Sequence, residues 1–565
     1  MKNNILIKSL LLASTFAAMG IAQPVVSDGG VVNAASYANP GIPSGAIAQG
    51  SMFIVFGARI GPATLTQVSS YPLPTSLGGT SIKITSGGTT VDAYIIYTTA
   101  SQVAAILPSN TPVGNATIAL SFGGQTSAPK PFRIVASSFG VFTRNQAGTG
   151  PGIFQNVNSG TDQPVNSYVA SAKPGQAIII WGTGLGSAPG NEAGGPIPGD
   201  LTNIPIEVYV GGKLAAVTYR GRSGCCSGID QIVFTVPDGV EGCNVPVSVR
   251  VGGVTGNFST IAVARNGGTC SSLTSGSAAE IAIAQRTGSY RHGTVALSSS
   301  TISTVVPGFG SIDIKAEVGS GSFIKSSLDQ LLTSSSTQDL TLGSCIVTPT
   351  QGASQPVDSV FGGFLDAGTQ INVNGPKGLK VLKKSTAGGS VLYSEQLSTP
   401  GIGGIPGIPG LPGGGSSDYL TAGSYAIDNG SGGADVGGFR GTLTIGAPLN
   451  WTNAASISTV IRTNSLPITW TGGDANGYAI ILGVSAVNDK VGASFACLTN
   501  ANAGSFTVPS WVLQALPATA QIAGTTPFGV LGLSISGAPV SFTASGLDSG
   551  YMLYNLSNIK SVDYR

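Results

Sequence analysis

Short strand-like segments separated by turn residues constrain this sequence more than any other feature. Examples are SMFIVFGARI (51–60), AIIIWG (177–182) and YAIILGVS (478–485). Such segments recur roughly every 8–12 positions between Gly, Pro, Asn and Ser, as in all-β sandwiches. The best helical candidate, SWVLQAL (510–516), stops at Pro517 and is at most two turns long. The pattern predicts an all-β fold.

An internal repeat organises the first half of the chain. GSMFIVFGARIG (50–61) matches GQAIIIWGTGLG (175–186), and QVAAILP (102–108) matches QIVFTVP (231–237) in the same order. In each copy a strand ending in Gly-Gly follows, and adjacent glycines suit tight hairpin turns. The repeat predicts two β modules, residues 23–137 and 138–267.

The order of these motifs is similar to that of the IPT/TIG immunoglobulin-like modules. More closely, residues 29–267 resemble an uncharacterised paired module found at the ends of secreted acidobacterial proteins. The recurring pieces are Val32-Asn33-Ala34-Ala35-Ser36, Gly140-Val141-Phe142 and Gly182-Thr183-Gly184-Leu185-Gly186. The resemblance implies tandem immunoglobulin-like sandwiches and export, and it implies no activity. The first copy has Arg59 where the second has Gly184, which leaves the conformation of the first turn open.

The remaining chain also has strand patterning but does not continue the repeat. We expect a linker over 268–285 and a larger C-terminal β-sandwich region over 286–565, either one domain or two subdomains. Within it, 401–417 is a Gly/Pro-rich segment with Gly at every third position from 401 to 413. About four triplets are too few for a collagen helix, which favours a loop.

Charge and targeting signals restrict where the protein works. Charged residues make up 9% of the chain and the formal net charge is +2. No basic run exists, which argues against nucleic acid and anionic membranes as partners. Residues 1–22 have the basic start, apolar stretch and small residues of a secretory signal peptide. No later apolar run could span a bilayer, so we expect no membrane insertion after signal removal. The predicted location is secreted, extracellular or cell-surface, with the periplasm as an alternative.

A search for catalytic chemistry returns no candidate. His292 is the only histidine, and no Gly-x-Ser-x-Gly motif supplies a nucleophilic serine that it could activate. We expect His292 to be an exposed strand-edge residue. GTGLG (182–186) precedes no helix, so it lacks the helix terminus of a dinucleotide site. We therefore predict no catalytic residue and no cofactor.

Metal and sugar sites are also weakly supported. DNGSGGAD (428–435) offers Asp428, Asn429 and Asp435 to calcium, but a glycine-rich turn explains it better. We predict no metal. The four tryptophans lie in apolar segments, which favours core packing over a sugar-stacking platform. They are Trp181, Trp451, Trp470 and Trp511.

Six cysteines in a secreted chain predict disulfides. They are Cys225, Cys226, Cys243, Cys270, Cys345 and Cys497. In an extended backbone the side chains of two adjacent residues point to opposite faces, so Cys225 and Cys226 should take different partners. We expect Cys226–Cys243, Cys225–Cys270 and Cys345–Cys497, with no free thiol.

Two classes of function remain. The first is a secreted, non-catalytic multi-domain protein with a structural, adhesive or polymer-binding role. Its partner would be an extracellular polysaccharide or protein. The second is a secreted carbohydrate-active enzyme that uses an Asp/Glu pair in one cleft.

Overall fold

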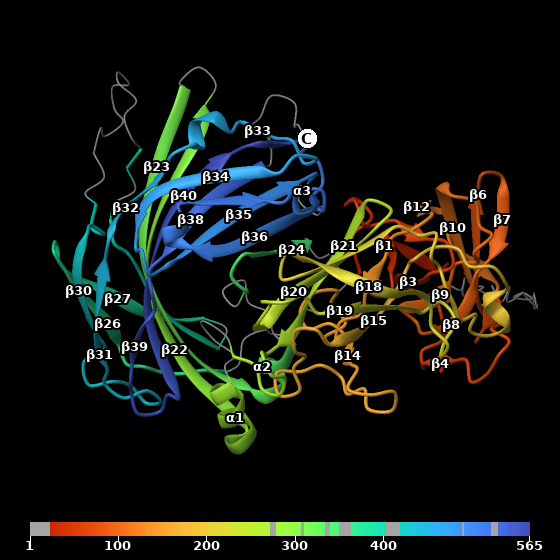
Figure 1. Ribbon diagram of the computed structural model, residues 1–565, viewed down its shortest axis with the longest axis horizontal. Coiled ribbons are helices and arrows are strands. Elements are labelled where there is room, and N and C mark those ends of the chain that lie inside the picture. The colour runs from red at the N-terminus through yellow and green to blue at the C-terminus, as the bar shows by residue number, and fades with distance from the viewer. Residues whose placement is uncertain are drawn as a thin grey trace, which may run out of the picture.

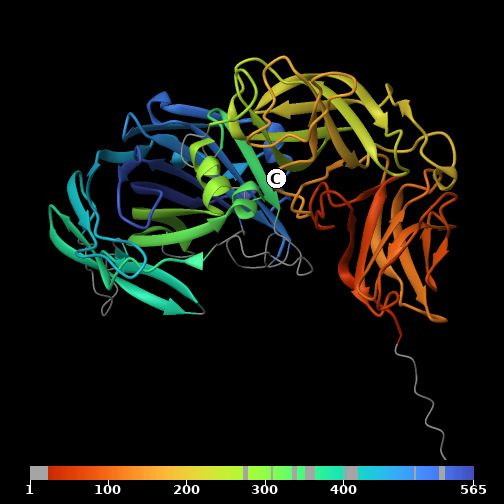
Figure 2. The same ribbon diagram turned by 90° about the horizontal axis from the view of Figure 1, so that it is seen from below.

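The computed structural model describes residues 23–271, 278–306, 310–333, 340–349, 363–387, 389–398, 401–402, 418–488, 491–520 and 529–565. The predicted signal peptide and residues 403–417 of the Gly/Pro-rich loop lie outside these ranges. The described chain is nearly all β, which confirms the predicted fold class. Figures 1 and 2 show three successive bodies, with the N-terminal strands at one end and the C-terminal region at the other. None of the helices in the described ranges has the length and apolar character needed to span a bilayer.

The first module is a sandwich of two sheets. One sheet has the order β1-β3-β9-β8-β4, and the other has β2-β12-β10-β6-β5 with β7 and β11 attached. Its strands are β1 (Val25–Asn33), β2 (Ile47–Ala48), β3 (Met52–Ala58), β4 (Thr66–Gln67), β5 (Ser76–Leu77), β6 (Thr80–Ser86), β7 (Thr89–Asp92), β8 (Tyr94–Thr98), β9 (Gln102–Ile106), β10 (Gly114–Phe122), β11 (Gln125–Thr126) and β12 (Lys130–Val135). Strand alternation builds the core: Ile82 and Ile84 are buried on β6, while Lys83 between them is exposed.

The second module folds one sheet over itself. The order is β13-β15-β19-β18-β17-β20-β21, with β14 and β16 attached. Strand β18 pairs with β17 at its start and with β19 after it, with an irregularity between Val217 and Tyr219. Its elements are β13 (Gly140–Val141), β14 (Phe154–Asn156), β15 (Ala177–Thr183), β16 (Gly199–Asp200), β17 (Ile206–Val210), β18 (Lys213–Arg222), β19 (Asp230–Thr235), β20 (Gly242–Val251), β21 (Val254–Val263) and the 3-10 helix η1 (Glu192–Gly194). Apolar side chains from both layers, among them Phe154, Phe234 and Val247, form one core.

The repeated glycines take the backbone conformations that the sequence requires. The Gly123-Gly124 and Gly252-Gly253 pairs all have φ between 57° and 85°, which confirms tight hairpin turns at both places. In the GTGLG turn, Gly184 has φ 113°. Its counterpart Arg59 is in the left-handed region at φ 58°, where a side chain is disfavoured. The Arg59 guanidinium donates hydrogen bonds to the Gln23 carbonyl, which holds this turn against the N-terminal segment.

The C-terminal region is built on one large sheet. Within the described residues it has 15 strands, in the order β24-β36-β35-β38-β40-β22-β23-β28-β27-β26-β30-β31, with β25, β29 and β39 attached. Its strands are β22 (Ser289–Val306), β23 (Gly310–Ser327), β24 (Ser344–Pro349), β25 (Gly363–Phe364), β26 (Gln370–Gly375), β27 (Gly378–Ala387), β28 (Ser390–Gln396), β29 (Gly401–Ile402), β30 (Gly423–Asp428), β31 (Arg440–Ile445), β35 (Tyr478–Ala486), β36 (Gly492–Asn500), β38 (Gly529–Ser536), β39 (Val540–Phe542) and β40 (Ser549–Ser561). The long strands β22 and β23 join the two halves of this sheet (Figure 1).

Two hydrophobic cores lie on the same face of this sheet. On β22 and β23, Val295, Leu297 and Phe323 belong to the core that β26–β31 close over. On β38, Leu531 and Leu533 belong to the core covered by smaller elements. Those elements are β32 (Ala447–Trp451), β34 (Leu466–Gly473), β37 (Ser505–Val508), β33 (Thr459–Val460), β41 (Asp563–Tyr564), the helix α3 (Ser510–Leu513) and the 3-10 turns η3 (Ala454–Ser456) and η4 (Ala501–Ala503).

Two helices occur where none was expected. α1 (Ala278–Thr287) occupies the end of the segment predicted to be a linker, and α2 (Leu328–Thr333) follows β23. The sequence of α1, AAEIAIAQRT, is rich in alanine, which has the highest helix propensity. Gly288, at φ 78°, stops the helix directly before β22.

The second module docks on the C-terminal region through Trp511 of α3. The Trp511 ring stacks on Tyr209 with centroids 4.1 Å apart, and it lies 5.7 Å from the ring of Phe258. The Thr255 hydroxyl donates to the Trp511 carbonyl at 2.9 Å. Arg250 also reaches across, with its Nη2 3.1 Å from Gln514 Oε1. This aromatic contact fixes the two bodies against each other.

Candidate functional site

The GTGLG turn lies at the junction of the two modules, over a buried ion pair. Asp230, at the start of β19, has no exposed surface, and Arg222 at the end of β18 is 3% exposed. The Asp230 carboxylate accepts hydrogen bonds from the backbone N–H groups of Gly184 and Leu185 at 2.7 and 2.8 Å. Arg222 pairs with Asp230 and also donates to the Gly186 carbonyl. The ion pair therefore holds the turn in shape, which is a structural role.

The other recurring motifs meet the same turn. Asn33, 1% exposed at the end of β1, donates through Nδ2 to the carbonyls of Ser138 and Thr183 at 3.2 and 3.1 Å. The Thr183 hydroxyl lies 2.9 Å from the backbone N of Met52 in the first module. A Cβ on Gly184 would lie 2.0 Å from the Ser138 carbonyl oxygen, so glycine is required for this close approach. The motifs that carry the family resemblance thus lock one module to the next.

The buried carboxylates of the described chain all have structural partners. They are Glu192, Asp230, Glu280, Glu317 and Asp563. Glu317 Oε2 accepts backbone N–H bonds from Tyr419 and Leu420, and Asp563 pairs with Arg565 at 2.6 Å. Glu280 accepts from the Tyr290 hydroxyl and Glu192 from the Ser109 hydroxyl. None of the five carboxylates is left without a partner for acid–base work.

Two of the three expected disulfides were wrong. The structure joins Cys243 to Cys270, and leaves Cys225 and Cys226 as free thiols. The reason is their place in the fold. Cys243 begins β20 and Cys270 follows its hairpin partner β21, so their Cα atoms are 5.3 Å apart. Cys225 and Cys226 lie in the loop between β18 and β19, and the argument from an extended backbone does not apply to a loop.

The third expected disulfide is present. Cys345 of β24 is bonded to Cys497 of β36, and the two residues are direct partners in the antiparallel ladder. The bond closes a segment of 152 residues in sequence separation. Only the Cys345–Cys497 pairing agrees with the sequence analysis.

His292 is not an exposed strand-edge residue, which corrects the sequence prediction. It lies in the sheet interior, with Ile324 of β23 on one side and Ser549 of β40 on the other. Its ring stacks near Tyr290 with centroids 5.9 Å apart, and burial lowers the pKa of His292. Its Nδ1 is buried without a hydrogen-bond partner among the described residues. The correction follows from strand order: β40, which flanks β22, comes some 250 residues later in the chain.

The lowered pKa of His292 predicts a pH dependence of stability. An unfolded chain binds a proton at this side chain near pH 6.5 more readily than the folded protein does. The free energy of unfolding should therefore fall as pH drops below about 6.5, by at most about 1.4 kcal/mol per pH unit. Urea unfolding at pH 5.5 and 7.5 measures this change. His292→Gln should remove the histidine-linked part of it, and an identical pH slope in wild type and variant would contradict the assignment.

The loop 428–435 forms turns with its polar side chains. Asp428 Oδ1 accepts from the Gly430 N–H and from Asn372 Nδ2, each at 3.0 Å. Asp435 Oδ2 accepts from the Asp366 N–H at 2.8 Å. Asn429 bonds to the carbonyls of Ala367 and Gly437. Within the described ranges, no group of three or more His, Cys, Asp or Glu side chains is placed to hold a metal ion.

Three of the four tryptophans are core residues. Trp451, Trp470 and Trp511 are between 3% and 9% exposed and belong to one hydrophobic core. Trp181 is half-buried, and its indole N–H donates to Gln155 Oε1 at 2.7 Å. The tryptophans therefore do not form a common sugar-stacking platform.

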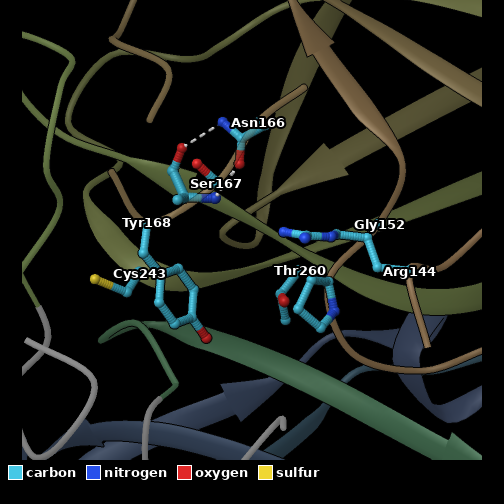
Figure 3. Close-up of a pocket in the computed structure, with 9 residues that line it drawn as sticks. Arg144, Gly152, Asn166, Ser167, Tyr168, Cys243 and Thr260 are labelled. Carbon is cyan, nitrogen blue, oxygen red and sulfur yellow. Dashed lines mark hydrogen bonds between the residues drawn. The ribbon is translucent and has the colours of Figure 1, made fainter. Parts of the chain in front are cut away.

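Two small cavities lie in the second module. One is lined by Arg144, Asn166, Tyr168 and Cys243, among others (Figure 3). The other lies beside Glu192 and Cys226. Each holds about 10 Å³, which is room for about one water molecule and none for a sugar ring. Neither cavity includes His292.

A further candidate surface is the sheet face opposite the two C-terminal cores, which we call the open face. It is formed by alternate side chains of β38, β40, β22, β23 and β28, in register across the strands. Most of these side chains are half-buried or exposed, on a mixed sheet in which β22 and β40 pair in parallel and the other neighbours are antiparallel. They are Val530, Gly532, Ser534, Ser536, Tyr551, Leu553, Asn555, Ser557, Ile559, Thr294, Ala296, Ser298, Ser300, Ile302, Ile314, Ala316, Val318, Ser320, Ser322, Leu392, Ser394 and Gln396.

None of the open-face positions named above is charged, and Lys383 of β27, opposite Ser394, is the charged side chain at their border. On β22, β23, β38 and β40 every Lys, Arg, Asp and Glu falls in the opposite phase, on the side of the cores. These residues are Arg291, Asp313, Lys315, Glu317, Lys325 and Lys560. Charge at every second position along these strands is the sequence signal of this segregation, and the strand patterns described above do not include it. The outcome is an uncharged, mixed surface, in which eleven of the named positions are Ser, Thr, Asn or Gln and nine are aliphatic.

Comparisons with known proteins leave the family open. No protein-family model matches the chain, and no curated protein matches it. Among solved structures, domains 4–9 of the surface layer protein SbsC are 11% identical, cover 94% of this chain and 83% of that chain, and give a TM-score of 0.16. SGBP-B of the Bacteroides ovatus mixed-linkage glucan utilization locus is 9% identical over 88% of this chain and 93% of that chain, with a TM-score of 0.13. Gamma-CGTase from Alkalophilic bacillus clarkii is 12% identical over 49% and 34%, with a TM-score of 0.16. These values assign neither a family nor an activity.

Proposed function

We propose that the protein is a secreted, non-catalytic binding protein that holds a neutral polysaccharide on its open face. In this proposal two immunoglobulin-like modules, residues 23–137 and 138–267, form a stiff unit that is fixed to the C-terminal region, residues 286–565. The observation that carries it is the segregation of charge, which leaves about twenty in-register positions without a single ionic group.

The chemistry of the open face suits a neutral ligand. Serine, threonine and asparagine side chains can donate and accept hydrogen bonds with sugar hydroxyl groups. Across β38 and β40, the hydroxyls of Ser534 and Ser557 already bond at 2.9 Å. A charged polymer would have to give up hydration without gaining an ionic partner, which costs free energy.

A protein partner fits this face less well. The residues that dominate protein–protein contacts are Trp, Tyr and Arg. The open-face positions named above include no Trp or Arg, and Tyr551 is the one Tyr among them. A carbohydrate-active enzyme is also a weaker candidate, because the buried carboxylates have structural partners and the two cavities are water-sized.

Charge placed on the open face should weaken binding. Ser298→Lys and Ser320→Lys are each expected to lower affinity for an insoluble neutral polysaccharide about tenfold, because the ammonium group must be desolvated, at about 1.4 kcal/mol per factor of ten. Binding isotherms on amorphous cellulose, chitin, starch and curdlan measure the effect. Alginate serves as the anionic comparison.

Two variants control for effects on folding. Ser320→Thr keeps a hydroxyl at the same position and should bind like the wild type. Leu214→Lys adds the same charge at a residue of the second module that is 60% exposed, and it should also bind like the wild type. Failure of the wild type to bind any of the four neutral polymers, or equal binding by all variants, would reject the proposal.

A further inference from the structure

Cys225 and Cys226 are adjacent thiols in a short, closed loop. The backbone N–H of Ser223 donates to the Ile229 carbonyl at 3.0 Å, and the N–H of Ile229 lies 3.4 Å from the Cys226 carbonyl. The Cys225 side chain is exposed and that of Cys226 is half-buried. The Ser223 hydroxyl lies 3.1 Å from Cys225 Sγ and accepts from the Cys225 N–H at 3.0 Å.

No other cysteine of the chain is available to form a disulfide with Cys225 or Cys226. Cys243 is bonded to Cys270 and Cys345 to Cys497, and all four are 2% exposed or less. The free thiols can therefore react only with each other or with a thiol or disulfide from outside. Burial, followed by the hydrogen bond to the Cys225 thiol, raises the pKa of Cys226 to about 11. Exposure thus makes Cys225 the thiol that meets an external reagent first.

We propose that Cys225 and Cys226 form a dithiol site that a small external disulfide oxidises to a bond between the two neighbours. The Cys225 thiolate attacks one sulfur of the external disulfide and releases one thiol. The Cys226 thiolate then attacks Cys225 Sγ, forms the Sγ–Sγ bond and releases the second thiol. Two thiols of the protein lose their protons and two electrons pass to the external disulfide, which is reduced to two thiols.

Adjacency favours this outcome over a lasting mixed disulfide. A sulfur held next to the mixed disulfide reacts as an intramolecular group, at high effective concentration. The bond formed is strained, because neighbouring Cα atoms are about 3.8 Å apart and disulfides normally span about 4.4–6.8 Å. Strained disulfides are the easily reduced ones, so the site is reversible rather than structural.

The loop also contacts the first module. The Ser227 N–H donates to the Tyr71 hydroxyl at 3.0 Å. The Gly228 carbonyl accepts from the Thr183 hydroxyl at 2.6 Å, and Gly228 lies against Ile106 and Met52. Ring closure at Cys225–Cys226 therefore takes place one residue from the contact between the modules.

The test uses the full-length chain and glutathione disulfide. Mild reductant in native buffer first frees the two loop thiols, and excess glutathione disulfide is then added. Thiol titration in denaturant and the mass of the peptide that carries both cysteines give the result. We expect the count to fall from two thiols per chain to zero, with the peptide about 2 Da lighter and no disulfide-linked dimer formed.

Two serine variants separate the roles of the thiols. Cys226→Ser should retain one glutathione on Cys225, because no resolving thiol remains. Cys225→Ser should react many-fold more slowly than Cys226→Ser, because its remaining thiol is half-buried. Two thiols that persist in excess oxidant, a stable glutathione adduct on the wild type, or disulfide-linked dimers would each overturn the proposal.

Discussion

Asp230→Ala is expected to lower the free energy of unfolding of the two-module unit by about 3–5 kcal/mol. The substitution leaves the Arg222 guanidinium, 3% exposed, without its counter-ion. It also removes the acceptor for the Gly184 and Leu185 N–H groups, so the GTGLG turn loses its internal support. The midpoint of the corresponding transition in urea measures the change.

An exposed ion pair on the same strand gives the matched control. Arg220 and Asp200 lie 4.0 Å apart with partly exposed side chains. Asp200→Ala should cost at most about 1 kcal/mol, as is usual for surface pairs. Equal losses for Asp230→Ala and Asp200→Ala would show that the junction does not depend on the buried pair.

Trp511→Ala is expected to separate the second module from the C-terminal region. The indole stacks on Tyr209 at 4.1 Å and is 9% exposed, so truncation leaves a cavity and costs about 3–5 kcal/mol. We expect the module and the C-terminal region to unfold in more widely separated transitions in calorimetry, with the C-terminal transition at lower temperature.

Trp511→Phe is the conservative control for this prediction. It keeps an aromatic ring between Tyr209 and Phe258 and should retain most of the coupling. A calorimetric trace for Trp511→Ala that matches that of the wild type would contradict a stabilising contact at this position.

Local sequence patterns were sufficient to predict part of the fold. Recurring strand-like segments predicted the all-β fold, and the paired glycines of the repeat, at 123–124 and 252–253, marked hairpin turns. The helix α1 was not predicted, because its alanines follow a serine-rich segment and the whole stretch was interpreted as a linker.

The sequence does not reveal which distant strands pair with one another, and this limited the prediction of the candidate site. His292 was predicted to lie at a sheet edge, because its own segment does not reveal which strands pair with it. One of these strands is β40, which lies far from β22 in the sequence. The cysteine pairing failed for a local reason, because the β20–β21 hairpin brings Cys243 to Cys270 while Cys225 and Cys226 lie in a loop. The open face exists only once β22, β23, β38 and β40 are in register.

Hydroxyl-radical footprinting with and without bound polysaccharide tests the proposed binding surface most directly. Ile302, Val318 and Leu392 on the open face are between 40% and 43% exposed. Leu65 and Leu214, on the two N-terminal modules, are each 60% exposed and serve as internal references. We predict several-fold lower oxidation of the three open-face residues in the complex and unchanged oxidation of Leu65 and Leu214. Protection confined to the modules, with the open face oxidised as in the free protein, would contradict it.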